Sequence, residues 1–185
     1  MPELLTYRRD QIPRDLAWQI RSYVRIQWPF LDAPQHAPFD ASSQADEQMH
    51  FLLVDGGLLV THASVNWRSI EHRGDSFSVF GLSTVFTYPA YRKGGHATRV
   101  VKAASDYIRT SQGDIAMLFC GPTLRDFYGK CGWQPADSAR ILFGQQLRPT
   151  LKNDNLVMMM FISEKGLAAR KIFEKQDVYV GESTW

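Results

Sequence analysis

The stretch that most constrains the fold of this chain is residues 79–97. It starts as an apolar, strand-like run, meets Pro89, crosses a basic glycine turn at residues 92–96 and opens onto a helical pattern. Amide N–H groups at a helix N-terminus have no partner inside the helix, and the aligned peptide dipoles favour negative charge there. Glycines also let the backbone approach a phosphate closely. This order of elements therefore predicts a site for a diphosphate-bearing cofactor.

Length and composition narrow the class of protein. The chain has 185 residues, of which 44% are apolar and 22% charged, with a formal net charge of +2. This length predicts one domain, residues 1–185, and the small net charge argues against nucleic-acid or anionic-membrane partners. No apolar run is long enough to span a bilayer, and the charged N-terminal segment does not resemble a signal peptide.

The two cysteines, Cys120 and Cys131, stand apart in the sequence and have no metal-ligand residues around them. Such sparse use of cysteine fits a reducing compartment and argues against a disulfide framework. We therefore expect a cytoplasmic protein without a metal site.

The spacing of apolar residues predicts the other strands and helices. Paired glycines at positions 56 and 57 predict a tight hairpin turn, and Gly81 inside an apolar run suggests a bend, a bulge or a close backbone approach. Strands are predicted at residues 4–8, 51–54, 58–67, 76–88, 115–119, 140–147 and 155–162, the last two as antiparallel neighbours. Helices are predicted at residues 13–27, from 97 to about 113, from 123 to about 130 with Thr123 as the cap, and at 163–175.

Two motifs in this chain resemble the signatures of the GNAT superfamily of acyl-CoA N-acetyltransferases. Arg92, Gly95 and Ala97 fit its Arg-x-x-Gly-x-Ala pattern after a strand and a proline, and residues 127–133 fit its second block, Phe-Tyr-x-x-x-Gly-aromatic. One helix and one buried strand separate the two motifs. The resemblance covers roughly residues 52–133. It implies a mixed α/β (α+β) fold, with a central, mostly antiparallel, twisted sheet of about six to seven strands and helices on both faces.

The resemblance also implies where acetyl-CoA, the acyl donor of the family, would bind. In the family the strand before the turn bulges, and its main chain pairs with the pantetheine arm. By position, this role falls on Val85, Phe86 and Thr87. The pyrophosphate would be held by Arg92, Lys93, Gly94, Gly95, His96, Ala97 and Thr98. The alternative for the paired glycines is an ordinary loop.

Tyr128 matches the residue that usually protonates the departing CoA thiolate in the family. A phenol with a pKa near ~10 is a suitable proton source for a thiolate whose acid has a pKa of ~8.5; the alternative is a core tyrosine. A primary ammonium must lose a proton before it attacks, and many relatives place a carboxylate for this purpose on the strand before the turn. Here that position is Ser83, which could only relay a proton through water to His62, Asp154, Glu182 or the C-terminal carboxylate.

Within the superfamily, the layout of the whole chain is most similar to the aminoglycoside 2'-N-acetyltransferases. Those enzymes grip a polycationic sugar with acidic side chains and C-terminal residues, a pattern that Asp154, Glu182 and Trp185 match. The alternative is a surface acid and a frayed tail.

These observations predict an acetyl-CoA-dependent N-acetyltransferase that acts on a primary amine of a small molecule, by direct transfer in a ternary complex. Two alternatives stay open. One is a non-catalytic acyl-CoA-binding sensor that lacks a base, and the other is an enzyme that acetylates a protein N-terminus or lysine. The sequence does not decide the identity of the acceptor, the preferred length of the acyl chain or the oligomeric state. A homodimer is one option for the oligomeric state.

Overall fold

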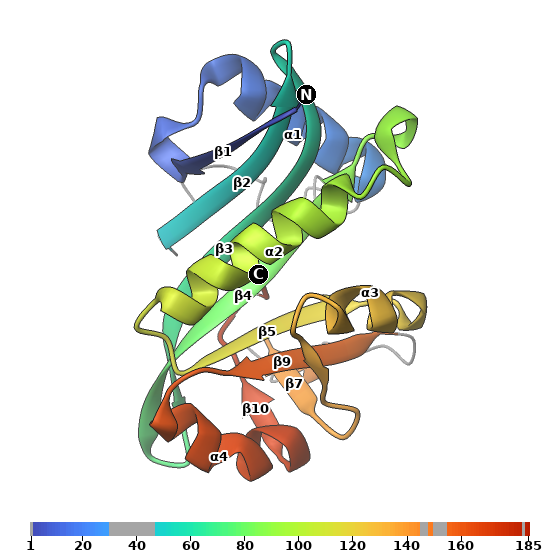
Figure 1. Cartoon of the computed structure of the whole chain (residues 1–185). Coiled ribbons are helices and arrows are strands. Elements are labelled where there is room, and N and C mark those ends of the chain that lie inside the picture. The colour runs from blue at the N-terminus through green and yellow to red at the C-terminus, as the bar shows by residue number, and fades with distance from the viewer. Residues whose placement is uncertain (1, 30–46, 145–147, 150–154, 183) are drawn as a thin grey trace.

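The computed structural model describes residues 2–29, 47–144, 148–149, 155–182 and 184–185 (Figure 1). Within these ranges the chain forms a seven-stranded sheet, in the order β1-β2-β3-β4-β5-β9-β6, and a three-stranded sheet, in the order β10-β7-β8. The strands are β1 (Glu3–Arg8), β2 (Glu47–Asp55), β3 (Leu58–His72), β4 (Asp75–Thr87), β5 (Ile115–Cys120), β6 (Gln134–Pro135), β7 (Arg140–Phe143), β8 (Arg148–Pro149), β9 (Leu156–Phe161) and β10 (Asp177–Tyr179). The helices are α1 (Arg14–Gln27), α2 (His96–Thr110), α3 (Arg125–Gly129) and α4 (Glu164–Lys175).

Neighbouring strands of the large sheet are antiparallel, except β4 and β5, which run parallel. The β4–β5 ladder is short, because only residues 79–81 of β4 pair with residues 115–117 of β5. Beyond this ladder the two strands diverge, while β5 stays paired with β9 as far as Cys120 (Figure 1). The sheet is therefore joined in its middle by a narrow seam and opens toward the C-terminal ends of β4 and β5.

Helices cover both faces of the large sheet (Figure 1). Leu53 of β2 packs in one apolar cluster with Val100 of α2, whereas Leu52 packs in another with Leu16 and Ile20 of α1. Successive side chains of a strand point to opposite faces, so α1 and α2 lie on opposite sides of the sheet. The predicted mixed α/β fold, with a mostly antiparallel sheet and helices on both faces, is confirmed.

Helix α4 lies on the same side of the sheet as α1. Its Phe173 packs edge-on against Phe77 of β4, with ring centroids 5.0 Å apart. Phe80, which is three positions after Phe77 in β4 and so points to the opposite face, packs in the cluster that contains Val100 of α2. The small sheet joins α4 on this side, because Ile141 of β7 belongs to the same cluster as Phe173.

The pairing predicted for the strands at residues 140–147 and 155–162 is wrong. β9 lies between β5 and β6 in the large sheet, whereas β7 pairs with β8 and runs parallel to β10 in the small sheet. Strand β9 is wholly apolar and buried along its middle, so it belongs inside the large sheet. An apolar run specifies a strand but not its partner, and β10 itself had no clear strand signal.

The predicted cap at Thr123 is also wrong. Thr123 lies within a 3-10 turn at Pro122–Leu124, and α3 begins after Leu124 without a side-chain cap. Ser163, in contrast, caps α4 by accepting a hydrogen bond from Gly166 N at 2.9 Å. Ser163 therefore acts as a helix cap, whereas Thr123 does not. Thr123 cannot take that place because it lies inside the 3-10 turn that Pro122 starts.

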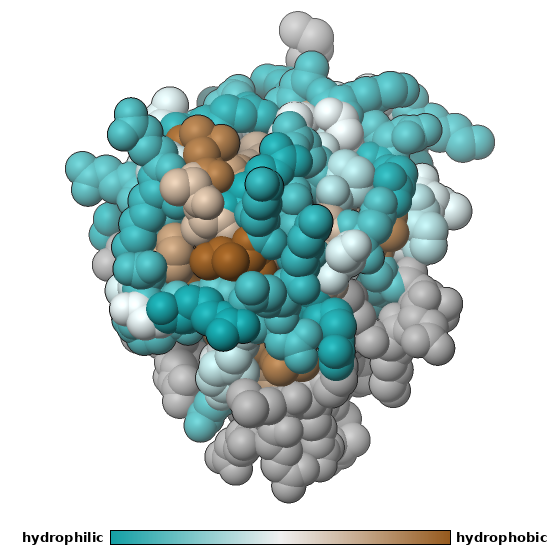
Figure 2. Space-filling view, turned by 90° about the horizontal axis from the view of Figure 1, so that it is seen from below, coloured by the Kyte–Doolittle hydropathy of each residue, from teal (hydrophilic) through white to brown (hydrophobic). Residues whose placement is uncertain are grey.

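The end of the molecule that carries α4 is mostly hydrophilic on its surface, with small hydrophobic patches (Figure 2). Leu167 of α4 is among the exposed large apolar residues, at 55% exposure. Scattered apolar side chains of this kind are ordinary on a protein surface. None of the described helices combines the length and apolarity needed to cross a bilayer.

Candidate active site

A cleft opens where β4 and β5 diverge. It has a volume of about 660 Å³ and reaches from the start of α2 to the end of β5. One wall is residues 82–87 of β4, and the other is residues 119–121 at the end of β5. The remaining lining side chains come from α1, from the turn before α2, from the region of α3 and from the start of β9: Tyr23, Gln27, Trp28, Arg92, Ala97, Leu124, Phe127, Tyr128 and Asn155.

The turn before α2 has the geometry of an anion site. Lys93 and Gly95 have positive φ angles of 69° and 76°. Arg99 N donates the first helical hydrogen bond, to Gly95 O at 3.2 Å. The amides of residues 96–98 therefore have no partner inside the helix. Such a helix N-terminus favours negative charge, so the turn fits a pyrophosphate group.

Arg92 ties this turn to α1. Its Nε donates to Thr87 O at 3.1 Å, and its Nη2 donates to the Tyr23 hydroxyl at 2.8 Å. Tyr23 in turn stacks on Phe86, with ring centroids 4.0 Å apart. These contacts hold the guanidinium beside the turn, where its fixed charge adds to the attraction for a phosphate.

Strand β4 bulges where it lines the cleft. Its ladder with β3 is regular up to Ser83 and resumes at Phe86, so Thr84 and Val85 together face a single residue of β3. Thr84 has a φ of +46°, a conformation that is rare for a β-branched residue and costs on the order of 1–3 kcal/mol. A bulge leaves its extra residue unpaired in the ladder. The bulge therefore interrupts the β3–β4 ladder where β4 lines the cleft.

Tyr128 lies on the opposite wall, in α3. The residue is 6% exposed, and no hydrogen bond to its phenol oxygen occurs within the described parts of the chain. Burial, and then the neighbouring Cys120 and Cys131, raise the pKa of this phenol well above its ordinary value. The phenol is therefore protonated at neutral pH, and its O–H has no acceptor among the described residues.

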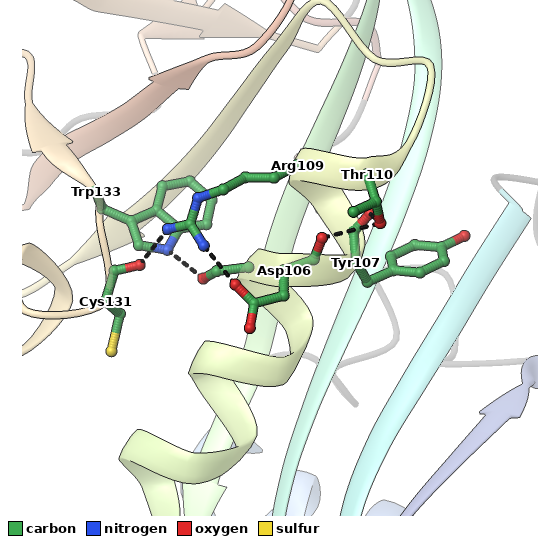
Figure 3. Close-up of polar contacts among 7 residues, drawn as sticks. Asp106, Tyr107, Arg109, Thr110, Cys131 and Trp133 are labelled. Carbon is green, nitrogen blue, oxygen red and sulfur yellow. Dashed lines mark hydrogen bonds and ion pairs between the residues drawn. The ribbon is translucent and has the colours of Figure 1, made fainter.

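Polar contacts fix the segment after α3 against α2 (Figure 3). Trp133 Nε1 donates to Ser105 Oγ at 3.0 Å, and both residues are buried. Arg109 Nη2 donates to Cys131 O at 2.8 Å, as Figure 3 shows. Gly132, which lies between Cys131 and Trp133 in the sequence, has a φ of +93°. A Cβ at this position would lie 2.1 Å from Arg109 Nη2. The second motif thus holds α3, and with it Tyr128, in a fixed position relative to α2.

The sequence of residues 28–136 matches the family model described as an acetyltransferase (GNAT) domain. The chain belongs to the GNAT acetyltransferase family. The matched region contains both motifs, the turn before α2 and the segment around Tyr128.

Solved structures of other proteins share this fold. The chain is similar to ElaA of Escherichia coli, with a TM-score of 0.63 and 13% identity over 86% of this chain and 99% of that one. It is similar to an acyl-CoA N-acyltransferase from Pseudomonas aeruginosa, with a TM-score of 0.59 and 12% identity over 86% and 99% of the two chains. YhbS, a GNAT N-acetyltransferase of Escherichia coli in complex with CoA, gives a TM-score of 0.60 and 15% identity over 97% and 90%. No curated protein matches the sequence.

In this GNAT chain, Ser83 is on the cleft wall formed by β4. Its Oγ lies 3.0 Å from Ser64 Oγ and 3.2 Å from Asn66 Nδ2. His62, one of the predicted relay partners, is fully buried and contacts Thr84 O through Nδ1 at 2.9 Å. Among the described residues, Ser83 therefore makes no hydrogen bond to a titratable side chain.

The buried histidines of this GNAT chain give stability a pH dependence. Burial lowers the pKa of His62 from 6.5 to about 4, and burial together with His62 and Arg9 lowers the pKa of His50 to about 2. Below pH 6.5 the unfolded chain binds protons that the folded chain does not bind. We therefore expect the free energy of unfolding to fall as the pH drops from 6.5 toward 4, by about 1.4 kcal/mol per pH unit for each histidine.

Urea denaturation at several pH values between 7.5 and 5 measures this slope. The matched control is His62→Asn, which removes one of the three buried histidines whose pKa is lowered, the third being His72, and should therefore reduce the slope. Identical slopes for the two proteins would contradict the assignment.

The cleft brings several predicted site residues together and leaves others outside. Its lining includes Ser83, Val85, Phe86, Thr87, Arg92, Ala97 and Tyr128. The other residues predicted for the pyrophosphate lie in the adjoining turn and the first turn of α2: Lys93, Gly94, Gly95, His96 and Thr98. Asp154 lies outside the described residues. Glu182 is exposed and is not part of the lining.

Trp185 packs on the sheet beside the cleft. A Cβ at Gly81 would lie 2.0 Å from the indole ring, so the close approach suggested for this glycine is confirmed. The ring centroid of Trp185 is 6.4 Å from that of Phe119, a cleft residue, and 5.2 Å from the guanidinium carbon of Arg68. Because Gly81 and Ser83 share one face of β4, the indole lies on the side of the sheet that Ser83 faces.

The wall formed by α1 has no local signature in the sequence. Tyr23 and Trp28 fit the apolar face of a predicted helix, but nothing local indicates that this helix packs beside β4. Tyr23 reaches the cleft because it stacks on Phe86 and accepts a hydrogen bond from Arg92. Residues that are distant in sequence make this wall, so only the folded chain reveals it.

Proposed function

We propose that this GNAT chain is an acetyl-CoA-dependent N-acetyltransferase, which moves an acetyl group directly to a primary amine of a small molecule in a ternary complex. One observation carries the proposal. A single cleft, lined by the β4 bulge and by Tyr128, reaches Arg92 and Ala97 on either side of the left-handed turn at the start of α2. In the proposal the turn, the bulge and Tyr128 serve as an anion site, a main-chain pairing site and a hydrogen-bond donor for a CoA thioester.

The donor would be held mainly by backbone groups. The amides at the start of α2 and the Arg92 guanidinium are suited to the pyrophosphate, and residues 85–87 of β4 are suited to the pantetheine arm. When bound, the thioester supplies an activated acyl group. Preorganised N–H donors near the bulge would orient it and stabilise a developing oxyanion.

Tyr128 is proposed to assist the departure of the CoA sulfur. Because its pKa is raised, complete proton transfer to a thiolate with an acid pKa of ~8.5 is uphill. A hydrogen bond from the phenol to the sulfur, as negative charge develops there, does not require that transfer. We therefore assign Tyr128 as a hydrogen-bond donor in the transition state; the proton that the acylated nitrogen loses balances the one that the CoA thiolate takes up.

Ser83 is proposed to orient the acceptor amine. Its hydroxyl cannot take a proton from an ammonium of pKa ~10 at neutral pH. It can accept a hydrogen bond from the N–H of an amine that enters uncharged. In this scheme the reactive acceptor is the free amine, so the rate for total amine should rise with pH up to the pKa of the acceptor.

The acceptor would lie on the side of the sheet where Ser83 and Trp185 face. The contact of Trp185 with Phe119 supports a role for the indole in the wall of that site. We retain Asp154 and Glu182 as candidate ligands for a cationic, aminoglycoside-like acceptor. We also propose that the activity belongs to one domain, residues 1–185, in the cytoplasm, where the free thiols of Cys120 and Cys131 would stay reduced.

An amine panel tests this proposal. The purified protein is incubated with acetyl-CoA at pH 7 and pH 8.5, and release of CoA thiol is measured with aminoglycosides, polyamines, amino acids and a lysine peptide. We expect turnover with at least one small amine, faster at pH 8.5. Turnover with the peptide alone would favour a protein acetyltransferase.

A second candidate function is an acyl-CoA sensor without catalysis, which the absence of a carboxylate at Ser83 favours. Calorimetry distinguishes the two. Binding of acetyl-CoA without turnover of any amine at either pH would support the sensor, whereas robust turnover would exclude it.

A further inference from the structure

A closed circuit of hydrogen bonds lies on the α1 side of the sheet, behind the bulge of β4. We call it the polar ring. Its imidazole half runs from Thr84 O to His62 Nδ1 (2.9 Å), from His62 Nε2 to His50 Nδ1 (2.9 Å), and from His50 Nε2 to the Gln48 amide (2.9 Å). Both histidines are buried, with exposures of 0% and 5%.

The other half of the polar ring consists of hydroxyls and amides. The Gln48 amide bonds to the amide of Asn66, which contacts Ser83 Oγ at 3.2 Å. Ser83 Oγ lies 3.0 Å from Ser64 Oγ, and Ser64 Oγ lies 2.7 Å from Thr84 Oγ1, which closes the circuit. The polar ring thus begins and ends on Thr84, first at its carbonyl and last at its hydroxyl.

The hydrogens of the polar ring follow from its chemistry. A carbonyl only accepts, so His62 Nδ1 must carry a hydrogen, and a neutral His62 then accepts at Nε2 from His50 Nδ1. A neutral His50 accepts at Nε2, so the Gln48 amide must turn its NH₂ group there. The Asn66 amide then turns as well, since the two ends of an amide exchange places on rotation.

With this arrangement every donor points the same way around the polar ring. Ser83 donates to Asn66, Ser64 to Ser83, and Thr84 to Ser64, and hydrogen bonds aligned in this way strengthen one another. The opposite arrangement of Gln48 places carbonyl oxygens at both ends of the imidazole pair, which would then need a third N–H and a buried positive charge. Burial lowers the pKa of both histidines, which favours the neutral arrangement.

The polar ring binds Thr84, the residue of β4 whose backbone φ angle is unfavourable. Thr84 is in the left-handed region, and the polar ring holds both its carbonyl and its hydroxyl. Both Thr84 and Val85 line the cleft. We propose that His62, seated by His50, is a positioning residue: it holds the Thr84 bulge in the shape that presents the main chain of β4 to the acyl donor, and it takes no proton from the acceptor. This inference rests on the proposed use of acyl-CoA.

A double-mutant cycle tests the inference. His62→Leu removes the donor to Thr84 O, whereas His62→Asn removes the imidazole but keeps an amide N–H near the place of Nδ1. Each change is made in the natural chain and in a Thr84→Gly background, because glycine adopts the left-handed conformation without support. The readouts are the affinity for CoA by calorimetry, measured without acceptor, and kcat and KM for acetyl transfer.

In the natural chain we expect His62→Leu to weaken CoA binding by about tenfold or more, and His62→Asn to weaken it by less than about threefold. In the Thr84→Gly background, His62→Leu should cost less than about threefold relative to Thr84→Gly alone. Equal losses for Asn and Leu would overturn the inference, because the imidazole itself would then be required. An undiminished loss in the glycine background would also overturn it, because His62 would not act through Thr84.

A second pair keeps the test decisive if the leucine variant does not fold. Ser64→Ala removes the partner of Thr84 Oγ1, so it should weaken CoA binding in the natural chain and have no further effect in the Thr84→Gly background; equal effects in both would overturn the inference. If the natural chain binds CoA but acetylates no amine, the proposed function fails while these affinities still decide the role of the polar ring. If the natural chain does not bind CoA at all, both proposals fail.

Discussion

A Tyr128→Phe variant is expected to lose about 100-fold in kcat for acetyl transfer while binding CoA as the natural chain does. Tyr128 lines the cleft, and within the described chain its phenol has no competing hydrogen-bond partner. Phenylalanine keeps the packing of the ring but leaves the developing thiolate without a donor, and the loss of one such donor typically costs 10²–10³ in rate. Release of CoA thiol at saturating amine measures kcat, and calorimetry measures binding.

The matched control is Tyr88→Phe. The Tyr88 hydroxyl donates to Gln19 O at 3.2 Å, and the residue does not line the cleft. This variant loses a phenol hydroxyl elsewhere in the molecule, so its kcat should stay within about threefold. If Tyr128→Phe also stays within threefold, the role assigned to Tyr128 is wrong.

The raised pKa of Tyr128 adds a second distinction. A phenol that had to ionise in each turnover would need a pKa near the working pH. Burial instead raises the pKa of Tyr128, away from the working pH. We therefore expect that ionisation of Tyr128 does not lower the rate of the natural chain between pH 8 and 10. Over this range the pH profiles of the natural chain and of Tyr128→Phe should have the same shape.

A Gly166→Ala variant is expected to lose about 2–3 kcal/mol in the free energy of unfolding. A Cβ at Gly166 would lie 2.1 Å from Asp114 O, which is main chain and cannot swing aside. That carbonyl accepts from Ile162 N at 2.8 Å, and the Asp114 carboxylate accepts from Ser78 N at 2.9 Å, so the segment is held on both sides. The start of α4 must then shift, and overpacking of this kind typically costs 1–3 kcal/mol.

Chemical denaturation measures this difference, with Gly129→Ala as the control. Gly129 is also helical, in α3, but a Cβ there meets nothing within 4 Å. Alanine has the higher helix propensity, so the control should be neutral or stabilised by up to about 1 kcal/mol. A Gly166→Ala protein as stable as Gly129→Ala would show that α4 is not closely packed against Asp114.

The parts of the site that depend on short stretches of sequence could be predicted, and the parts that depend on pairing could not. The turn before α2 has local causes: glycine at a left-handed position, a basic residue beside it and an apolar stripe after it. Residues 140–143 and 156–161 were recognisable as strands, but their partners depend on the whole sheet.

The polar ring is the clearest case that sequence reasoning missed. In the sequence, His50, His62 and Asn66 are polar residues within predicted strands. Polar residues that alternate with apolar ones in a strand ordinarily face solvent. These three are buried because β2, β3 and β4 place them side by side, where each satisfies the next. Likewise, the strained φ of Thr84 follows from a register shift that no residue type announces. A threonine within a β-branched run predicts an ordinary strand.

The three-residue ladder between β4 and β5 has a consequence for cohesion. It is the main-chain ladder that joins the strands before α2 to those after it in the large sheet, and the cleft begins where it ends. A ligand that contacts both walls would act as a clasp across this junction. Since binding to the folded state alone stabilises it by mass action, by ~2.7 kcal/mol at a hundred times Kd, an acyl donor would tie together two parts of the chain that the backbone joins at only a few residues.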